Sequence, residues 1–543
     1  MRADQKGYAS HVLILMLIMR KVRGFPACRR YFAHDHRGLV AALVAVALCV
    51  SGCTAAAGSS NTGGPPRYGG DLTVANALDI PTLDKDRAVT SNQALRVVEN
   101  IFDRLYVLDA KGKPVPSLAT KCTSSADRLT WTCPLRKNAE FSNGRPITAT
   151  DVSFSLLLAK KGVYMGSLYS LITAVQAPDP HTVVIKTKSP DPAMLPKLTM
   201  FDSGVIPANF GGEKQNDFWK KPVSSGPFVV KSYRTGSGLT LVPNKHYWGP
   251  KPYLDSVTFK PVADPNTRVL QLRNQQAQIV EHPSDAQLQT LNHSAGLSVN
   301  RFPSTEVDYF SLNTTRKPFD NVHVRHAISL AIDRASIVKA AVMGNGGPAG
   351  CFMAPPILDG HLPAQGTEFN VAKAKAELAK SPVPNGFHAT LLYVGSNSPA
   401  WGIAAQVVQA DLAKIGIKLD IKNADSNTVS DAEEHKSFDM LMSLLTYDIP
   451  DPSELVDYYF SSDDYHSYFP ATTMKKLNRQ AYSTFDNAKR MDIYQKIADQ
   501  VAADGAIVSL YTVPWTYATS KRLHGFSVVN TGQYSLSKLW LSK

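Results

Sequence analysis

After residue 70, the spacing of apolar positions switches repeatedly between the period of a strand and that of a helix. Apolar side chains two positions apart, as in Leu129, Trp131 and Cys133, indicate a half-buried strand. Further strands are expected over 72–74, 183–185, 228–230, 239–242, 389–394 and 417–421. Apolar side chains three or four positions apart predict helices over 91–105, 152–159, 323–332, 334–342 and 403–415. Because strands and helices alternate in both halves of the chain, the pattern predicts an α/β fold.

Residues that favour helix N-termini stand where the helical periods begin. Ser91 stands at the start of the first predicted helix, and Asn321 and Asp333 precede two predicted helices of the second half. Thr150 or Asp151 is expected to cap the helix over 152–159. These residues predict the helix starts from local chemistry alone.

The longest apolar run of the N-terminal region covers residues 39–50 and follows a series of basic residues, the layout of an export signal. It is shorter than the roughly 20 residues that a stable membrane-spanning helix needs. The run ends in Val-Ser-Gly-Cys, which resembles a bacterial lipobox, and this resemblance implies that Cys53 is lipidated. A plain secretory signal cleaved near Ala56 is the alternative.

Residues 1–53 are therefore assigned to a lipoprotein signal peptide, with residues 1–18 interpreted as an extension from a misassigned start codon. The next segment, 54–70, is rich in glycine, serine and proline and is predicted to be a flexible tether. The expected location is the outer face of the cell membrane, where a lipid on Cys53 anchors the chain.

Composition and charge narrow the class of protein. The chain has 543 residues, of which 44% are hydrophobic and 19% charged, a composition that excludes wholesale disorder, collagen and coiled coil. The net charge of +13 invites a nucleic-acid interpretation, but six of these charges lie within the first 53 residues. The remaining basic residues are scattered rather than clustered with aromatics, so no nucleic-acid partner is predicted.

Two cysteines of the exported part are spaced for a hairpin. A turn centred between Asp127 and Arg128 would place Cys122 directly opposite Cys133, within reach of a disulfide. Export to an oxidising compartment permits the bond, while two free buried thiols remain the alternative. Cys351 has no evident partner, and its role stays open.

Catalytic and metal-binding motifs are not found in the sequence. It contains no GxSxG, HExxH or CxxC pattern, and His323 and His326 are spaced like ligands but lack a carboxylate beside them. We therefore predict no enzyme activity, no metal site and no cofactor. Tyr and Trp instead recur beside turn residues, as at Trp401 and Trp515, a composition typical of binding sites as well as of cores.

An ordered series of segments resembles the family 5 extracellular solute-binding proteins of ABC importers, which include oligopeptide, dipeptide and nickel binders. The segments extend over essentially the whole exported chain; they are 81–84, 101–105, 116–119, 129–132, 135–152, 225–228, 244–249, 254–255, 319–321, 324–325, 331–334 and 447–452. Each segment is weak alone, and their common order carries the resemblance.

The resemblance implies a two-lobed clamp of the periplasmic-binding-protein type II, in the large class with an extra subdomain. Lobe I is expected to comprise 71–95, 222–305 and 515–543, with the inserted subdomain at 96–221 and lobe II at 306–514. The chain then crosses twice between the lobes, and the ligand is enclosed between them by hinge closure.

The resemblance also indicates ligand-binding residues. In the peptide-binding members an aspartate pairs with the α-ammonium of the peptide, and the matching position is Asp448, beside Tyr447. The alternative is that Asp448 is a turn residue before Ile449 and Pro450. Ser91, Asn313 and Trp515 fall near the lobe edges on the same map, with local structural roles as their alternatives.

One departure from the family concerns the other end of the ligand. Dipeptide binders carry an arginine for the ligand carboxylate shortly before the helix that matches 403–415, whereas residues 395–402 here hold no basic residue. A strict dipeptide binder is therefore disfavoured, and Trp401 is a candidate for stacking on the ligand. The predicted function is capture of peptides for an ABC permease and its ATPase by a monomeric, lipid-anchored protein. The alternative is a nickel chelate, haem or another small solute on the same scaffold.

Overall fold

The computed structural model describes residues 64–350, 352, 368–395, 398, 400–457 and 472–543. Residues 65–543 form one compact unit. The signal peptide with Cys53, most of the tether, and Cys351 lie outside the described residues. Within the described part no helix is long and apolar enough to cross a bilayer.

The first large sheet has seven strands, built from both ends of the described chain. Their order is β12 (Leu297–Phe302), β19 (Trp515–Ser520), β11 (Ile279–Glu281), β1 (Asp71–Asn76), β10 (Ser256–Pro261), β9 (Gly238–Pro243) and β8 (Phe228–Arg234). The central strand β1 is parallel to β10 and β11, and the outer pairs are antiparallel. Alternate side chains such as Leu72 and Val74 are fully buried, as the strand period predicts.

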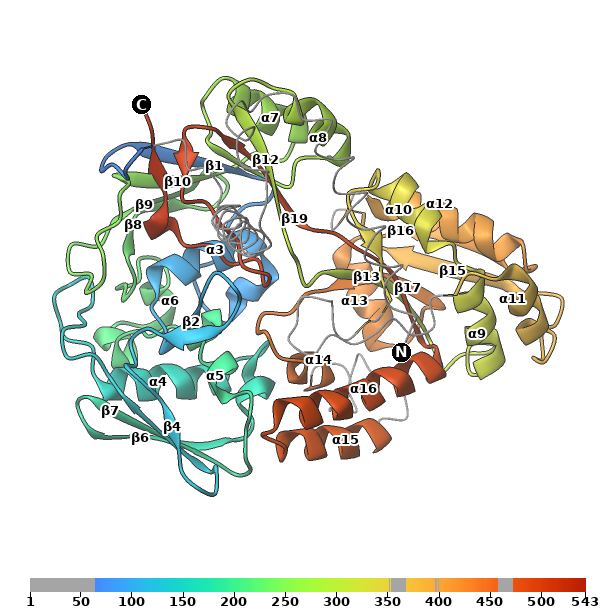
Figure 1. Cartoon of the computed structure of the whole chain (residues 1–543), viewed down its shortest axis with the longest axis horizontal. Helices are drawn as coiled ribbons and strands as arrows, with labels where there is room; N and C mark the ends of the chain where they lie inside the picture. The colour runs from blue at the N-terminus through green and yellow to red at the C-terminus, as the bar shows by residue number, and fades with distance from the viewer. Residues whose placement is uncertain (1–63, 351, 353–367, 396–397, 399, 458–471) are drawn as a thin grey trace, which may run out of the picture. The chain divides into compact units, whose positions relative to one another are not determined.

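The second large sheet has six strands, all from the later part of the chain. Their order is β14 (Gly347–Pro348), β18 (Ile507–Thr512), β13 (Val307–Leu312), β17 (Met440–Leu445), β15 (His388–Tyr393) and β16 (Lys418–Asn423). The helices around it are α9 (Val322–Ala331), α10 (Arg334–Ala341), α11 (Val371–Leu378), α12 (Ala400–Ala413) and α13 (Ser426–Glu434). They bury their apolar faces in a second hydrophobic core (Figure 1).

Each large sheet, with its helices, forms one lobe of an α/β fold, and the chain passes between the two sheets twice. It leaves β12 for β13 and returns from β18 to β19, and these strands pair with one another as β12 with β19 and β13 with β18. The Ser304 hydroxyl donates to the Val513 carbonyl at 2.5 Å, which joins the two crossing segments directly. The predicted two-lobed α/β architecture is confirmed.

A smaller sheet lies in the segment between α3 (Asn92–Ile101) and β8. It has the order β4 (Thr123–Ser124), β5 (Thr130–Pro134), β7 (Thr182–Thr187) and β6 (Ile172–Asp179), and α4 (Ala149–Lys160) packs on it (Figure 1). Short pairs β2 (Tyr106–Leu108) with β3 (Pro114–Pro116), and β20 (Leu523–His524) with β21 (Trp540–Leu541), complete the strands of the described residues. The remaining helices are α5 (Met194–Lys197), α6 (Gln215–Phe218), α7 (Pro265–Arg273), α8 (Asp285–Asn292), α14 (Ser453–Val456), α15 (Thr472–Tyr482) and α16 (Asn487–Asp504).

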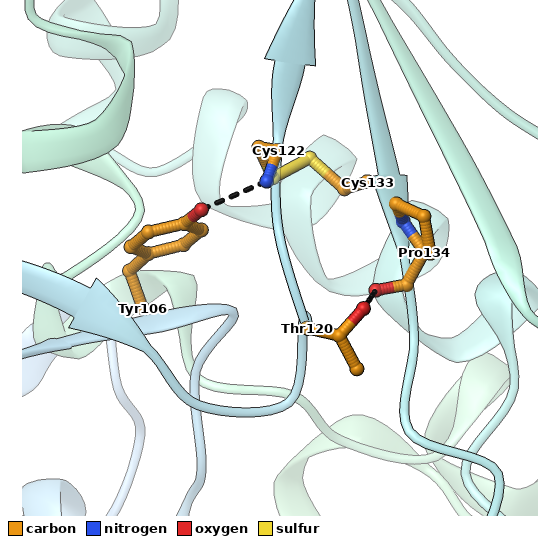
Figure 2. The surroundings of a disulfide bond; sticks show 5 residues. All are labelled: Tyr106, Thr120, Cys122, Cys133 and Pro134. Atoms are coloured by element: carbon orange, nitrogen blue, oxygen red, sulfur yellow. Dashed lines mark hydrogen bonds between the residues drawn. A yellow bond between two sulfur atoms is a disulfide. The ribbon is translucent and has the colours of Figure 1, made fainter.

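Cys122 and Cys133 form a disulfide in this small sheet (Figure 2). Thr123 pairs with Thr132 across the hairpin, the register that sets the two cysteines opposite each other. The backbone N–H of Cys122 donates to the Tyr106 hydroxyl at 2.8 Å, so this end of the hairpin is also tied to β2 (Figure 2).

Three of the predicted helix caps are confirmed, and one is wrong. Ser91, Asn321 and Asp333 accept backbone N–H groups at the starts of α3, α9 and α10. Helix α4 instead begins after Thr148, and Asp151 stands at its third position, where its carboxylate accepts the Thr148 backbone N–H at 2.9 Å. In this capping box, an acidic residue inside the first turn stabilises the helix start by accepting the backbone N–H of the residue that caps it.

Candidate functional site

The segment after β17 carries the predicted ligand-binding pair Tyr447 and Asp448. Tyr447 is fully buried, and its backbone is held by Thr305 in the first crossing segment. The Tyr447 N–H donates to the Thr305 hydroxyl at 3.0 Å, and that hydroxyl lies 3.3 Å from the Tyr447 carbonyl. The crossing segment thereby fixes where the following turn begins.

Glu454 holds the turn itself. Its buried carboxylate accepts the backbone N–H groups of Asp448 and Ile449, at 3.0 Å each for the shorter contacts. Asp451 accepts the Ser453 N–H at 2.9 Å and is paired with Arg490 of α16. Since these neighbours supply the hydrogen bonds of the turn, the Asp448 carboxylate is not required for it.

Helix α3 brings a buried ion pair to the same region. Arg96 and Glu99 lie on successive turns, with Nη1 and Oε2 3.6 Å apart, and both side chains are buried. The Arg96 guanidinium also stacks over the rings of Trp515 and Tyr534, 5.9 and 5.7 Å from their centroids. Cation–π contacts of this kind gain strength when water is excluded.

A chain of side-chain contacts connects this pair to the start of α3. The Tyr534 hydroxyl donates to Glu281 at 3.0 Å, and the Gln93 amide donates to the other Glu281 oxygen at 3.3 Å. Gln93 in turn accepts from the Ser91 hydroxyl at 3.3 Å. Residues 91, 281 and 534 are thus parts of one buried polar network at the first sheet.

The charges of Arg96 and Glu99 act on the carboxyl group of Asp448. Burial, helped by the Glu99 and Asp202 carboxylates and opposed by Arg96, raises the pKa of the Asp448 carboxyl to about 7. Asp202, which accepts the Tyr169 hydroxyl at 2.5 Å, has its own pKa raised by burial to about 6. Arg96 lowers the pKa of Asp448 and Lys85 lowers that of Asp202, while Glu454 adds another carboxylate beside Asp448. A cationic group of a ligand at Asp448 would favour its ionised form.

The structure gathers four of the predicted ligand-binding residues in this region and places two elsewhere. Ser91 caps α3, Trp515 lies under Arg96, and Tyr447 and Asp448 lie in the turn. Asn313 is buried and donates to the carbonyls of Lys436 and Phe438, a role in holding a loop.

Trp401 is also placed away from the turn. It is 1% exposed, lies in the core of the second sheet, and donates from Nε1 to Asp308 at 2.6 Å. Since the ring is fully enclosed by protein in this conformation, it presents no face on which a ligand could stack.

Sequence reasoning missed the buried charged residues of this region. They are Arg96, Glu99, Asp202, Glu281 and Glu454. Arg96 and Glu99 were hidden because they stand on the polar side of an amphipathic helix, the side that ordinarily faces water. Helix α3 is buried on all sides, its polar side included, and no local pattern in the sequence signals that burial.

The described residues contain no group of three or more His, Cys, Asp or Glu side chains that could hold a metal ion. His323 contacts Glu377 at 2.8 Å, and His326 contacts the Ala503 carbonyl at 2.8 Å. Each of these contacts engages a ring nitrogen, which accounts for the two histidines structurally. The groups that the region around Asp448 can offer a ligand are charged side chains and hydrogen-bonding groups.

Comparison with known proteins agrees with this architecture. Residues 113–467 match the family described as "Bacterial extracellular solute-binding proteins, family 5 Middle". The chain is 29% identical over 476 residues to the probable D,D-dipeptide-binding periplasmic protein DdpA of Escherichia coli strain K12, covering 84% of this chain and 91% of that protein.

Solved structures show the same fold. The DppA periplasmic binding protein from Helicobacter pylori, in complex with the peptide STSA, has a TM-score of 0.77 and 25% identity, covering 88% of this chain and 99% of that one. The binding protein AgaA from A. tumefaciens R10, in complex with agropinic acid, has a TM-score of 0.76 and 26% identity, covering 87% and 99%. The chain belongs to the bacterial extracellular solute-binding proteins of family 5.

Proposed function

We propose that this protein is the peptide-capturing component of an ABC importer and that Asp448 receives the amino terminus of the peptide. The observation that supports this most directly is the half-buried Asp448 carboxylate, whose pKa is raised to about 7 by burial and by Glu99 and Asp202. An α-ammonium placed there would relieve the repulsion among the carboxylates and make a charge-assisted hydrogen bond.

The relatives support peptides as cargo. DdpA is described as a probable D,D-dipeptide-binding protein, and H. pylori DppA was solved with a tetrapeptide-length ligand, STSA. The absence of a basic residue in the sequence of 395–402 favours peptides longer than a dipeptide, because no cation there would hold a nearby carboxylate. A non-peptide solute is the second candidate, because the similar protein AgaA was solved with agropinic acid.

The proposal includes the organisation of the whole chain. Lobe I comprises 71–95, 222–305 and 515–543, the inserted subdomain 96–221, and lobe II 306–514; the seven-stranded, four-stranded and six-stranded sheets fall in these ranges respectively. The turn with Asp448 belongs to lobe II, and α3 straddles the boundary between lobe I and the subdomain. A ligand that contacts both would stabilise the closed state.

We further propose that Cys53 carries a lipid that holds the protein at the outer face of the cell membrane, where a permease and its ATPase receive the peptide. A monomer suffices for this role. Cys53→Ala should release the protein from the membrane fraction into the soluble fraction, and mass spectrometry should find the lipid on the wild-type chain alone. Wild-type protein without that mass would refute the anchor.

The peptide assignment is tested by titrating tri- to pentapeptides, each paired with its N-acetylated form. Asp448→Asn should weaken binding of the free-amine peptides by about 2 kcal/mol, roughly 30-fold, and acetylation should have the same effect on the wild type. Asp431→Asn, which changes an exposed carboxylate on α13, is the matched control. If acetylated and free peptides bind equally, Asp448 does not hold the amino terminus. If only opine-like or chelate ligands bind, the peptide proposal fails.

A further inference from the structure

The loop that joins β11 to α8 places His282 at the boundary between the two large sheets. Because β11 runs antiparallel to β19, its end lies beside the start of β19, where the chain arrives from the six-stranded sheet. His282 directly follows β11 and is exposed, whereas its neighbours Glu281 and Pro283 are buried. An exposed side chain at this boundary can contact a molecule that is held between the lobes.

The backbone of His282 is held in a strained conformation. Its φ is +48°, in the left-handed region that residues other than glycine seldom adopt. Arg268, which is buried, fixes this turn, because Nη2 of its guanidinium donates to the His282 carbonyl at 3.1 Å. Nη1 of the same guanidinium donates to the carbonyls of Val262 and Ala263, which follow β10, at 2.8 Å each. Backbone strain that the surrounding structure maintains in this way points to a role for the side chain.

A short series of contacts leads from His282 to the turn that carries Asp448. The imidazole ring lies edge-on to the ring of Trp515, with 6.3 Å between their centroids. Nε1 of Trp515 donates to the Asn530 carbonyl at 2.8 Å, and the same carbonyl accepts the Thr305 N–H at 3.1 Å. The Thr305 hydroxyl accepts the backbone N–H of the residue before Asp448 at 3.0 Å. His282 and Asp448 thus stand on opposite sides of the boundary, each fixed to the crossing segments.

The protein keeps the His282 imidazole neutral. Desolvation lowers the pKa of the ring, Glu281 opposes this change, and the guanidinium groups of Arg96 and Arg268 lower the pKa further. A neutral imidazole has one nitrogen that donates a hydrogen bond and one that accepts. Neither ring nitrogen of His282 has a hydrogen-bond partner among the described residues. Both nitrogens are therefore left for a bound molecule.

A neutral imidazole is complementary to a peptide group. A peptide group offers one carbonyl that accepts and one N–H that donates, which matches the donor and the acceptor of the ring. A carboxylate only accepts and an ammonium only donates, and a neutral ring balances the charge of neither. The chemistry of His282 therefore fits the main chain of a peptide better than its charged ends.

We propose that His282 binds a main-chain peptide group of the ligand, next to the amino terminus that Asp448 receives. The inference rests on the proposal that the protein captures peptides. His282 then supplies the contact from the lobe of the seven-stranded sheet, and Asp448 supplies the contact from the other lobe. A ligand that makes both contacts favours the closed state, so His282 selects peptides over amines that lack a peptide group.

The test titrates the purified full chain with trialanine and with two analogues, in which the first or the second peptide bond is replaced by an ester. An ester has no N–H and is a weaker acceptor, so one analogue should bind the wild type about fivefold more weakly or worse. His282→Phe keeps an aromatic ring beside Trp515 and removes both nitrogens. It should weaken trialanine binding by a similar factor and bind that analogue about as well as trialanine. His293→Phe, the same change at an exposed histidine that ends α8, is the matched control and should behave as the wild type.

His282→Gly is the second variant, since glycine adopts a φ of +48° without strain and carries no side chain. It should also lose the discrimination between amide and ester, and it decides the matter if His282→Phe has a lowered melting temperature. Wild-type affinity or wild-type discrimination in the folded His282 variants would overturn the proposal, as would equal binding of trialanine and both esters by the wild type.

The same titrations separate this inference from the proposed function. If Asp448→Asn weakens trialanine binding while the His282 variants bind as the wild type does, the role of His282 is refuted and peptide capture stands. Absence of trialanine binding to the wild type overturns the role of His282, and absence of binding by all tri- to pentapeptides overturns peptide capture as well.

Discussion

Arg490 holds Asp451 through two parallel hydrogen bonds, Nη1 to Oδ2 at 2.7 Å and Nη2 to Oδ1 at 2.6 Å. Both side chains are buried, and the pair joins α16 to the turn that carries Asp448. The ion pair keeps the pKa of the Asp451 carboxyl below its usual range despite burial. A bidentate contact of this kind fixes direction as well as distance, so it orients the turn.

Removal of Arg490 should therefore cost both stability and binding. Arg490→Ala leaves a buried carboxylate without its cation, and we expect a loss of about 3–5 kcal/mol in the free energy of unfolding, measured by urea denaturation. Arg479→Ala, which changes an exposed arginine on α15, is the control and should stay within about 0.5 kcal/mol of the wild type. A similar small loss in Arg490→Ala would show that the pair does not support the turn.

The pKa of Asp448 predicts how peptide affinity depends on pH. An ammonium binds best when the carboxylate is ionised, and the folded pKa is about 7. Affinity for peptides with a free amino terminus should therefore fall as the pH is lowered from 7.5 to 5.5, and it should fall again above about pH 8, where the α-amino group of the peptide loses its proton. Asp202, with a pKa near 6, acts in the same direction.

Calorimetry across this pH range checks the prediction. Asp448→Asn should bind weakly with a much flatter profile, because the titrating group is gone. A wild-type affinity that is constant from pH 5.5 to 8.5 would contradict ionisation of Asp448 on binding.

The buried Asp308 carboxyl predicts that the wild-type protein loses stability as the pH rises. Burial raises the pKa of this carboxyl to about 7, above the value near 3.9 of an unfolded aspartate. The folded state then binds the proton more tightly, so this contribution to stability is lost as the pH rises from about 4 to about 7. Asp308→Asn keeps an oxygen for the Trp401 N–H and removes the charge.

The variant should be more stable than the wild type at pH 8 by about 1.4 kcal/mol or more, since a tenfold change in proton affinity corresponds to that amount. The difference, measured by urea denaturation, should shrink as the pH is lowered to 5. A variant less stable than the wild type at pH 8 would mean that the Asp308 charge is compensated.

The disulfide predicts a redox-dependent stability. It links positions 11 residues apart, and closure of so short a loop is worth about 3 kcal/mol on the chain-entropy account. Reduction should lower the free energy of unfolding by about that amount. The double variant Cys122→Ala and Cys133→Ala should lose a similar amount and show no further response to reductant. An oxidised wild type no more stable than this variant would contradict a stabilising bond.

Local chemistry accounts for the features that the sequence predicted well. Ser91, Asn321 and Asp333 cap helices because each side chain bonds to N–H groups two or three positions ahead. The hairpin register that pairs Cys122 with Cys133 also depends on a short loop. The misplaced start of α4 shows the limit of this reasoning, since Asp151 satisfies a capping rule from a different position.

By itself, then, the sequence determined the α/β pattern, the helix caps, the paired cysteines and the family, because these follow from neighbours along the chain or from the order of segments. Only the tertiary structure decided which side chains meet around Asp448. Arg96, Glu281 and Tyr534 are more than 180 residues apart along the chain, yet they share one buried network, and Trp401 is removed to the other core. Contacts between such distant residues depend on how the sheets and helices pack, and no local spacing encodes that packing.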